Sequence, residues 1–187
     1  MKKFYSFSLC LIITCVFASC RSRNRIDKEI RDFHRSHIEL SLDSMVNFSS
    51  KDCTSIYDQI KYIYVMYVDS TSCSDCAISH LSDWAQLDII NNYRELMFKY
   101  VFIVAPKREQ YMHISKIIEK DTVFNESIFI DTIGVFERYN TNLPKNKLLH
   151  SFLINKQRNV ELIGNPITNI RIKDMLIKIL DEADKNS

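Results

Sequence analysis

The 187-residue chain carries nearly balanced charge, with 25 Lys and Arg against 23 Asp and Glu and a formal net charge of +2. This balance argues against a nucleic-acid partner, since a protein that binds nucleic acid usually shows a basic patch and a high pI. A hydrophobic share of 46%, with only two glycines and three prolines, indicates one globular domain and excludes a low-complexity chain or a repeat array.

The first 19 residues have the pattern of an export signal. Two lysines precede an apolar run over residues 4–17, and two small residues follow it. The run is too short to span a bilayer comfortably, whereas its position after a charged start suits the export machinery. We therefore predict that residues 1–19 are a signal peptide, and that the chain left without its two lysines is formally neutral.

The tetrapeptide Phe17-Ala18-Ser19-Cys20 resembles the lipobox of bacterial lipoproteins, with Phe17 where leucine is usual. The resemblance implies that Cys20 carries acyl chains such as palmitate and becomes the first residue of the mature protein. The acyl chains would hold the protein on a membrane of the bacterial cell envelope, facing the periplasm. Ordinary cleavage after Ser19, which leaves a free thiol, is the alternative. Residues 20–35 are rich in charge, which suits a solvated tether that passes into a first short helix.

Three cysteines remain as thiols once the signal peptide is gone and Cys20 is acylated, namely Cys53, Cys73 and Cys76. Disulfides persist outside the cytoplasm, so cysteine pairing is expected in this compartment. The simplest account is one pair and one leftover thiol. Cys53 is interpreted as a buried or stray thiol, and a role as a second resolving cysteine is the alternative.

From residue 36 to residue 187 we predict a single α/β domain. Its first elements are a half-buried strand within 38–48, where apolar residues alternate, a short helix at 54–60 and a strand at 61–68. The last of these is apolar on both faces, as in a central strand that is covered on both sides. Periodicity and turn residues then predict a helix at 77–92, a strand at 99–104, a helix around 111–118, a strand at 127–130, a short helix at 133–139, a hairpin of strands 151–154 and 159–163, and a helix from 168 to about 184.

Two stretches resemble the thioredoxin-like superfamily, in particular its exported and membrane-tethered branch. One is the buried strand followed by Cys73-Ser-Asp-Cys76 and a helix, and the other is Ser151-Phe-Leu-Ile-Asn, a turn, and Val160-Glu-Leu-Ile-Gly. The resemblance covers about residues 38–184 and implies a central mixed sheet with helices on both faces and a C-terminal hairpin plus helix. It also implies thiol-disulfide exchange on exported proteins, with a separate redox partner and no cofactor. The segment ending Gly164-Asn165-Pro166 resembles small lipoproteins of the Bacteroidetes group.

Cys73 and Cys76 fall where the buried strand gives way to a helix. A sulfur at a helix N-terminus lies near unsatisfied backbone N–H groups, which favour its thiolate. The i, i+3 spacing brings both sulfurs to one helical face, close enough to bond. A bridge that closes so small a loop removes little chain entropy, which argues against a stabilising role. Cys73 is therefore predicted to attack, and Cys76 to resolve the mixed disulfide.

Three features depart from the thioredoxin pattern. Ser72 replaces the tryptophan before the first cysteine, and Asp75 stands between the cysteines, where a carboxylate opposes the neighbouring thiolate and suits a reductant better than an oxidant. Leu149, His150 and Ser151 replace the cis-proline loop that faces the pair, and they are the predicted substrate loop. A non-proline cis bond is costly, so we expect this loop to be either trans or strained. Its changed sequence favours the alternative, a non-catalytic binding or scaffold protein with an inert cysteine pair.

A copper-handling chaperone is a further alternative, because two thiolates and an imidazole make a soft-metal site. His80 follows Cys76 by four residues, and His150 stands in the loop that the fold brings toward Cys73. Copper-delivering relatives space their cysteines by three residues rather than two, and single surface histidines are common. A zinc site lacks its second cysteine pair, and Ala77 after Cys76 does not match haem attachment. We therefore predict no metal and no cofactor.

Overall fold

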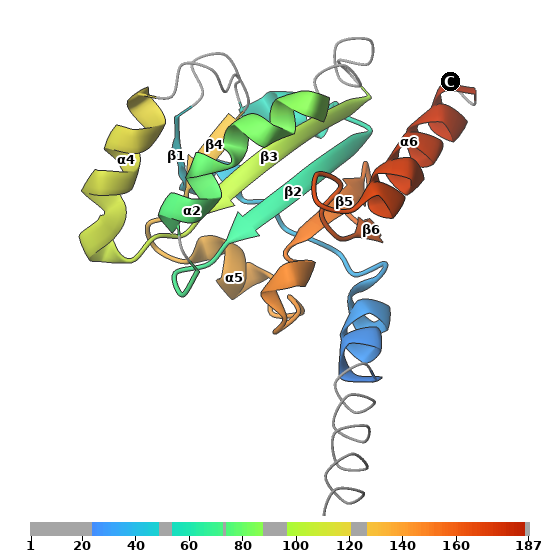
Figure 1. Ribbon diagram of the computed structural model, residues 1–187, viewed down its shortest axis with the longest axis horizontal. Coiled ribbons are helices and arrows are strands. Elements are labelled where there is room, and N and C mark those ends of the chain that lie inside the picture. The colour runs from blue at the N-terminus through green and yellow to red at the C-terminus, as the bar shows by residue number, and fades with distance from the viewer. Residues whose placement is uncertain (1–23, 49–53, 73, 88–96, 121–126, 186–187) are drawn as a thin grey trace, which may run out of the picture.

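The computed structural model describes residues 24–48, 54–72, 74–87, 97–120 and 127–185. In these ranges the strands form a six-stranded sheet with the order β1-β4-β3-β2-β5-β6 (Figure 1). The strands are β1 (Val46–Asn47), β2 (Tyr62–Val68), β3 (Phe98–Val104), β4 (Ser127–Ile130), β5 (Ser151–Asn155) and β6 (Val160–Ile163). The helices are α2 (Ser74–Ser79), α4 (Tyr111–Lys120), α5 (Val135–Tyr139) and α6 (Ile170–Lys185), with 3-10 turns η1 (Leu42–Ser44), η2 (Thr54–Asp58), η3 (Leu81–Leu87), η4 (Arg108–Gln110) and η5 (Lys147–Leu149).

A further helix over residues 24–33 precedes the sheet and extends away from it (Figure 1). Its last residue, Phe33, is buried and packs edge-on against Phe152 of β5, with ring centroids 5.0 Å apart. The last turn of the predicted tether helix is therefore part of the packed domain. Within the described ranges, no helix combines the length and the apolar character that crossing a membrane requires.

Three parallel strands form the middle of the sheet. β2 pairs with β3 and β3 with β4, and the register places Val68, Val104 and Ile130 side by side. These strands are rich in β-branched and aromatic residues and are buried on both faces, as expected for parallel strands that helices cover on both sides. Because their carboxyl ends meet at one edge, the loops that follow β2, β3 and β4 lie next to one another.

Antiparallel strands complete the sheet on either side of this centre. β1 pairs with β4, while β5 pairs with β2 and β6 with β5. The predicted hairpin of β5 and β6 is confirmed, and the N–H of Arg158 closes its turn by donating to the carbonyl of Asn155 at 2.9 Å. The mixed sheet with a terminal hairpin and helix confirms the predicted α/β architecture.

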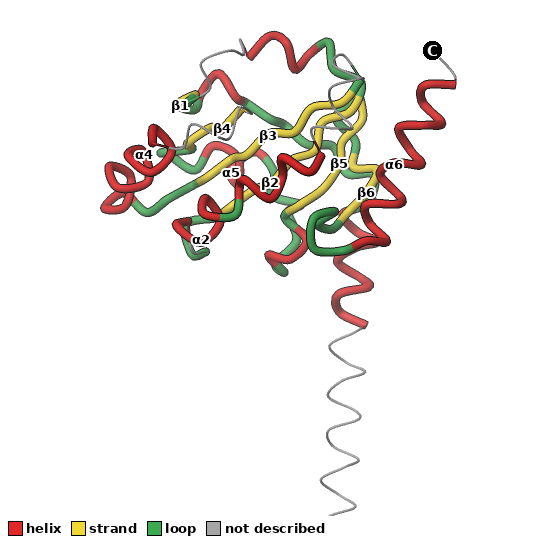
Figure 2. The backbone as a smooth tube through the Cα atoms, turned by 45° about the horizontal axis from the view of Figure 1, so that its top comes forward, coloured by secondary structure: helices red, strands yellow, loops and turns green. Residues whose placement is uncertain are grey.

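Two apolar clusters fill the two faces of the sheet. One cluster packs buried residues of 38–45, Tyr57 and Phe136 of α5 against the strands. The other packs α2, η3, α4 and α6 against the opposite face, and Figures 1 and 2 show α2 lying along the strands on that side. Trp84, whose helical spacing predicts a core position, is buried here and stands edge-on to Phe102 with ring centroids 5.1 Å apart.

The predicted strand within 38–48 is wrong over most of its length. Only Val46–Asn47 forms a strand, although Ile38, Leu40 and Leu42 are buried. Ser41 has a left-handed backbone, with φ 46°, and η1 follows it. The alternation of apolar residues over 38–42 therefore indicates which side chains face the core. The turn at Ser41 prevents continuous strand pairing over this segment.

Two helix predictions also change. The helix expected at 77–92 is α2 followed by the separate 3-10 turn η3, and residues 88–92 lie outside the described residues. The final helix begins at Ile170, two residues later than predicted. Its start is capped by the Asn169 side chain, whose Oδ1 accepts from the N–H of Arg171 at 3.0 Å. The apolar spacing of this helix also predicts a buried Met175, but its side chain is exposed.

Candidate functional site

The loop between β2 and α2 is organised by one carboxylate. Asp69 directly follows β2, and its Oδ1 accepts hydrogen bonds from the Ser72 hydroxyl at 2.8 Å and from the Thr71 hydroxyl and N–H at 3.0 Å each. The N–H of Ser72 also donates to the Asp69 carbonyl at 3.1 Å. The polar run after β2 thus folds around Asp69. We call residues 69–72 the cysteine loop because Cys73 comes next.

The flanking elements confirm the predicted strand-to-helix junction. β2 ends at Val68, α2 begins at Ser74, and the backbone of Cys76 lies in the first turn of α2. Cys73 is outside the described residues, as are Cys20 and Cys53. The bond between the sulfurs of Cys73 and Cys76 therefore stays a prediction.

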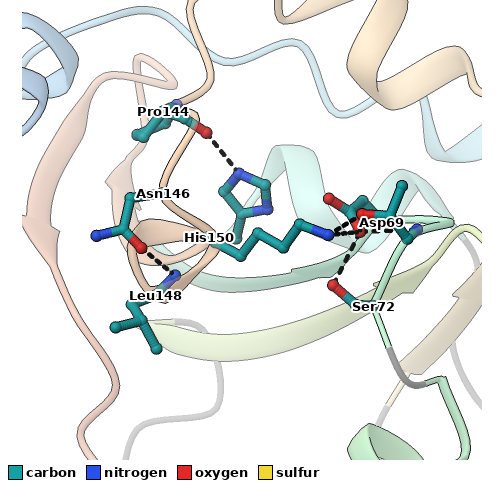
Figure 3. Close-up of polar contacts among 8 residues, drawn as sticks. Asp69, Ser72, Pro144, Asn146, Leu148 and His150 are labelled. Carbon is teal, nitrogen blue, oxygen red and sulfur yellow. Dashed lines mark hydrogen bonds and ion pairs between the residues drawn. The ribbon is translucent and has the colours of Figure 1, made fainter.

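A second loop, the η5 turn before β5, lies beside the cysteine loop. Pairing of β5 with β2 sets Ser151 opposite Met66, and the N–H of Tyr67 donates to the His150 carbonyl at 2.9 Å. From this turn the ammonium Nζ of Lys147 reaches across to Asp69 Oδ1 at 2.9 Å and also contacts the Thr71 hydroxyl (Figure 3). The two loops are therefore joined by an ion pair.

The predicted substrate loop is mostly hidden. The side chains of Leu149, His150 and Ser151 are buried, and within the described residues every peptide bond is trans. The Nε2–H of His150 donates to the Pro144 carbonyl at 2.8 Å, and its ring lies 5.4 Å from that of Tyr67. The segment that stands where the resemblance implies a cis-proline loop is therefore a trans turn whose side chains pack inward.

The backbone of the η5 turn is occupied by internal hydrogen bonds. The N–H of Leu149 donates to the Asn146 carbonyl at 2.9 Å, and that of His150 to the Lys147 carbonyl at 3.1 Å. The N–H of Leu148 donates to Asn146 Oδ1 at 3.1 Å (Figure 3). Of the two leucines in this turn, Leu149 is buried and Leu148 faces solvent with an exposure of 80%.

Sequence reasoning missed Asp69, Asn146, Lys147 and Leu148 as residues of this edge. Asn146 caps the η5 turn through its side chain, and asparagine before a short turn is a signal that the sequence does contain. The pairing of Asp69 with Lys147 joins positions 78 residues apart, and no local pattern reports it.

Negative charge gathers around the end of β2. Burial raises the pKa of Tyr67, and the carboxylates of Glu137, Asp131 and Asp69 raise it further. Burial by itself also raises the pKa of Asp69, but hydrogen bonds from Lys147, Ser72 and Thr71 outweigh it and lower that pKa to about 2. Asp69 is thus a permanent anion at neutral pH.

The two histidines of the copper alternative lie in different surroundings. His80 is exposed, and its Nδ1 lies 3.0 Å from the Asp83 carboxylate, whereas the ring of His150 is buried beside Tyr67. In the part of the chain that the structure describes, no three His, Cys, Asp or Glu side chains are grouped to hold a metal ion. A metal site that includes Cys73 is outside the described residues.

Comparisons with known proteins identify the fold. No protein-family model matches the chain, and no curated protein matches it in sequence. The structure is similar to the solution structure of a thioredoxin-like protein in the oxidised form, with a TM-score of 0.51, 13% identity, and coverage of 80% of this chain and 97% of the other. It is also similar to a Chlorobium tepidum protein assigned as the thiol:disulfide interchange protein DsbE, with a TM-score of 0.50, 13% identity, and coverage of 79% and 97%.

A third similar structure is the exposed lipoprotein thioredoxin of Streptococcus pneumoniae, with a TM-score of 0.46, 16% identity, and coverage of 68% of this chain and 88% of the other. The assignment rests on the first two structures, whose similarity extends over most of both chains. The chain has a thioredoxin-like fold.

Proposed function

We propose that the protein is a membrane-anchored thiol-disulfide oxidoreductase that acts on exported proteins through Cys73 and Cys76. The observation that carries the proposal is the place of the Cys-Ser-Asp-Cys sequence at the junction of β2 and α2. This junction lies at the carboxyl ends of the three parallel strands, the edge where open α/β sheets usually bind ligands. The thioredoxin-like fold supports the proposal, because it sets the cysteine loop beside the η5 turn.

The proposed reaction is a two-step exchange that moves two electrons to the substrate. The thiolate of Cys73 attacks one sulfur of a substrate disulfide, so a mixed disulfide forms and the other substrate sulfur leaves as a thiolate that takes up a proton. The Cys76 thiol then loses its proton and attacks the Cys73 sulfur. The second substrate thiol is released, and a Cys73–Cys76 disulfide remains. A dithiol partner in the envelope restores the reduced pair by the same exchange, and the reverse sequence oxidises a substrate.

Anchoring through Cys20 is part of the proposal. The signal sequence and the lipobox-like tetrapeptide support it, and acyl chains would hold the protein on a membrane of the envelope. Metabolic labelling with palmitate should mark the wild-type protein, and Cys20→Ser should abolish the label. A labelled Cys20→Ser protein would contradict the anchor.

Trapping of mixed disulfides tests the proposed reaction. In cells that export the full-length protein, Cys76→Ser should accumulate adducts with other exported proteins, because the resolving thiol is missing. The adducts should collapse under reducing agent on gels, and Cys73→Ser/Cys76→Ser, the matched control, should form none. Equal adduct levels in both variants would contradict the proposed roles of the two cysteines.

One observation favours a second candidate, a binding or scaffold protein with an inert cysteine pair. The η5 turn buries the predicted substrate loop and uses its amide groups internally, so this backbone is not free to pair with a substrate peptide. The scaffold reading predicts that the purified protein does not accelerate reduction of insulin by dithiothreitol, and that removing both cysteines leaves its partners bound.

A further inference from the structure

The ion pair between Asp69 and Lys147 joins the η5 turn to the cysteine loop, which directly precedes Cys73 in the chain. Lys147 Nζ lies 2.9 Å from Asp69 Oδ1, and the side chains are 43% and 13% exposed respectively. The same carboxylate oxygen holds the hydroxyl of Ser72, the residue that directly precedes Cys73. The net charge of the Asp69–Lys147 pair therefore acts on the chain directly before Cys73.

A carboxylate that is partly shielded from water benefits from donors, because removing a charge from water is costly. Asp69 has such donors and stays ionised, since its pKa is held near 2. An uncompensated anion four residues before a nucleophilic cysteine opposes formation of the thiolate. Exchange at neutral pH would then be slow, because the thiolate is the reactive form.

Other carboxylates among the described residues near this end of β2 add negative charge. Glu137 and Asp131 add negative charge on the α5 side, as their effect on Tyr67 shows. Glu29 of the 24–33 helix approaches the η5 turn from the other side and accepts from the Asn146 N–H at 2.9 Å. His150, which directly follows the η5 turn, directs its Nε2–H to a backbone carbonyl.

We infer that Lys147 is a positioning residue for the cysteine pair, and that its ammonium neutralises Asp69 while it ties the η5 turn to the cysteine loop. This inference rests on the proposed function and adds to it a charge balance that sets the reactivity of Cys73. The η5 turn, which lacks the proline that the resemblance implies, contributes the ammonium group of Lys147. The two members of the pair then have opposite effects on the cysteine, which distinguishes this role from that of a purely mechanical clasp.

The test measures the pKa of the Cys73 thiol in the purified full-length protein. Iodoacetamide alkylation is followed from pH 5 to pH 10, and mass spectrometry of the Cys73 peptide separates it from the other cysteines. Lys147→Met leaves Asp69 uncompensated and should raise the thiol pKa by about 0.5 to 1, so that alkylation at pH 7 slows about three- to tenfold. Asp69→Asn leaves Lys147 uncompensated and should lower the pKa and speed alkylation by a similar factor.

Three further variants complete the test. The double variant Asp69→Asn/Lys147→Met should return to within about twofold of wild type, and Lys147→Arg should behave like wild type because it keeps the charge. Lys145→Met, which removes an exposed cation two residues away, is the matched control and should have no effect. Circular dichroism checks that each variant is folded.

The signs of the two shifts decide the result. Shifts of the same sign in Lys147→Met and Asp69→Asn, or no shift in either, would overturn the inference and leave the ion pair a structural clasp. Failure of the proposed function is a separate outcome. It would appear in the wild-type protein itself, as a cysteine pair that does not exchange reversibly with glutathione.

Discussion

Asp69 and Asp131 follow aligned strand ends of the sheet but differ in their hydrogen-bond partners. Asp69 follows β2 and Asp131 follows β4, and the register aligns the strand ends that precede them. Asp131 is 1% exposed, and its carboxylate accepts from the backbone N–H groups of Val135 at 2.9 Å and Phe136 at 2.8 Å. Asp69 instead accepts mostly from side chains, including a cation from a distant turn.

Their hydrogen-bond partners distinguish Asp131, which stabilises the fold, from Asp69, which lies in the cysteine loop. The donors to Asp131 are backbone N–H groups at the start of α5, which are present whatever the side chains are. Asp131 therefore fixes the start of that helix to the sheet. The donors to Asp69 are mostly side chains, and substitutions can alter their charge while the backbone keeps its fold. The same residue type at the same edge is therefore structural on the β4 side, whereas on the β2 side it belongs to the site that we propose.

The largest expected effect is the loss of stability when Asp131 is replaced. Asp131→Ala leaves buried N–H groups at the start of α5 without their acceptor, and we expect it to lower the free energy of unfolding by about 2–4 kcal/mol. Asp69→Ala should cost about 1 kcal/mol or less, since its partners reach solvent. Urea unfolding followed by circular dichroism compares the two. Equal losses would remove the distinction between the aspartates.

A smaller effect separates two adjacent leucines of the η5 turn. Leu149 is buried, whereas Leu148 is 80% exposed. Leu149→Ala should cost about 2 kcal/mol through lost burial and a partly filled cavity, and Leu148→Ala should stay within about 0.5 kcal/mol of wild type. The same unfolding measurement applies. A costly Leu148→Ala with a harmless Leu149→Ala would mean that the turn faces the other way.

The smallest effect is the pH dependence that Asp69 contributes. Its folded-state pKa of about 2 lies below its ordinary value of 3.8. The ionised carboxylate therefore stabilises the fold fully above pH 3.8, and this contribution disappears as the pH falls toward 2. Relative to Asp69→Asn, the wild-type protein should lose up to about 1 kcal/mol of its advantage over this range.

Urea unfolding at pH 7, 5 and 3 checks that prediction. Asp58→Asn is the matched control, because Asp58 also pairs with a cation, Arg158 at 3.0 Å, but has a side chain that is 79% exposed. Its pH dependence should follow that of wild type. A constant difference between wild type and Asp69→Asn across these pH values would show that the carboxylate is not stabilised by its donors.

The sequence predicts the central strands and the hairpin well, because apolar runs and turn residues report them locally. It also identifies the inward-facing residues Ile38, Leu40 and Leu42, but it predicts a strand where Ser41 makes a left-handed turn. Alternation shows which residues are buried and does not show whether the backbone has a pairing partner. Strand pairing depends on the rest of the sheet.

The candidate site is predicted only in part. The Cys-Ser-Asp-Cys spacing and the turn residues before it locate the strand-to-helix junction, and the structure confirms that junction. The resemblance to thioredoxin-like proteins also led to Leu149, His150 and Ser151, whose side chains the structure buries. Exposure and ion pairing depend on how the η5 turn folds against the cysteine loop, so Lys147 and Leu148 become visible only in three dimensions.

The reduction potential of the Cys73–Cys76 pair tests the central claim most directly. The purified full-length protein is equilibrated in glutathione or dithiothreitol buffers of defined potential, and free thiols on the two cysteines are counted by alkylation and mass spectrometry. Thiol-disulfide exchange predicts a reversible two-electron couple between roughly −270 and −120 mV. A pair that stays bridged far below this range, or that never forms a bridge, would contradict the proposed function and leave a binding or scaffold role.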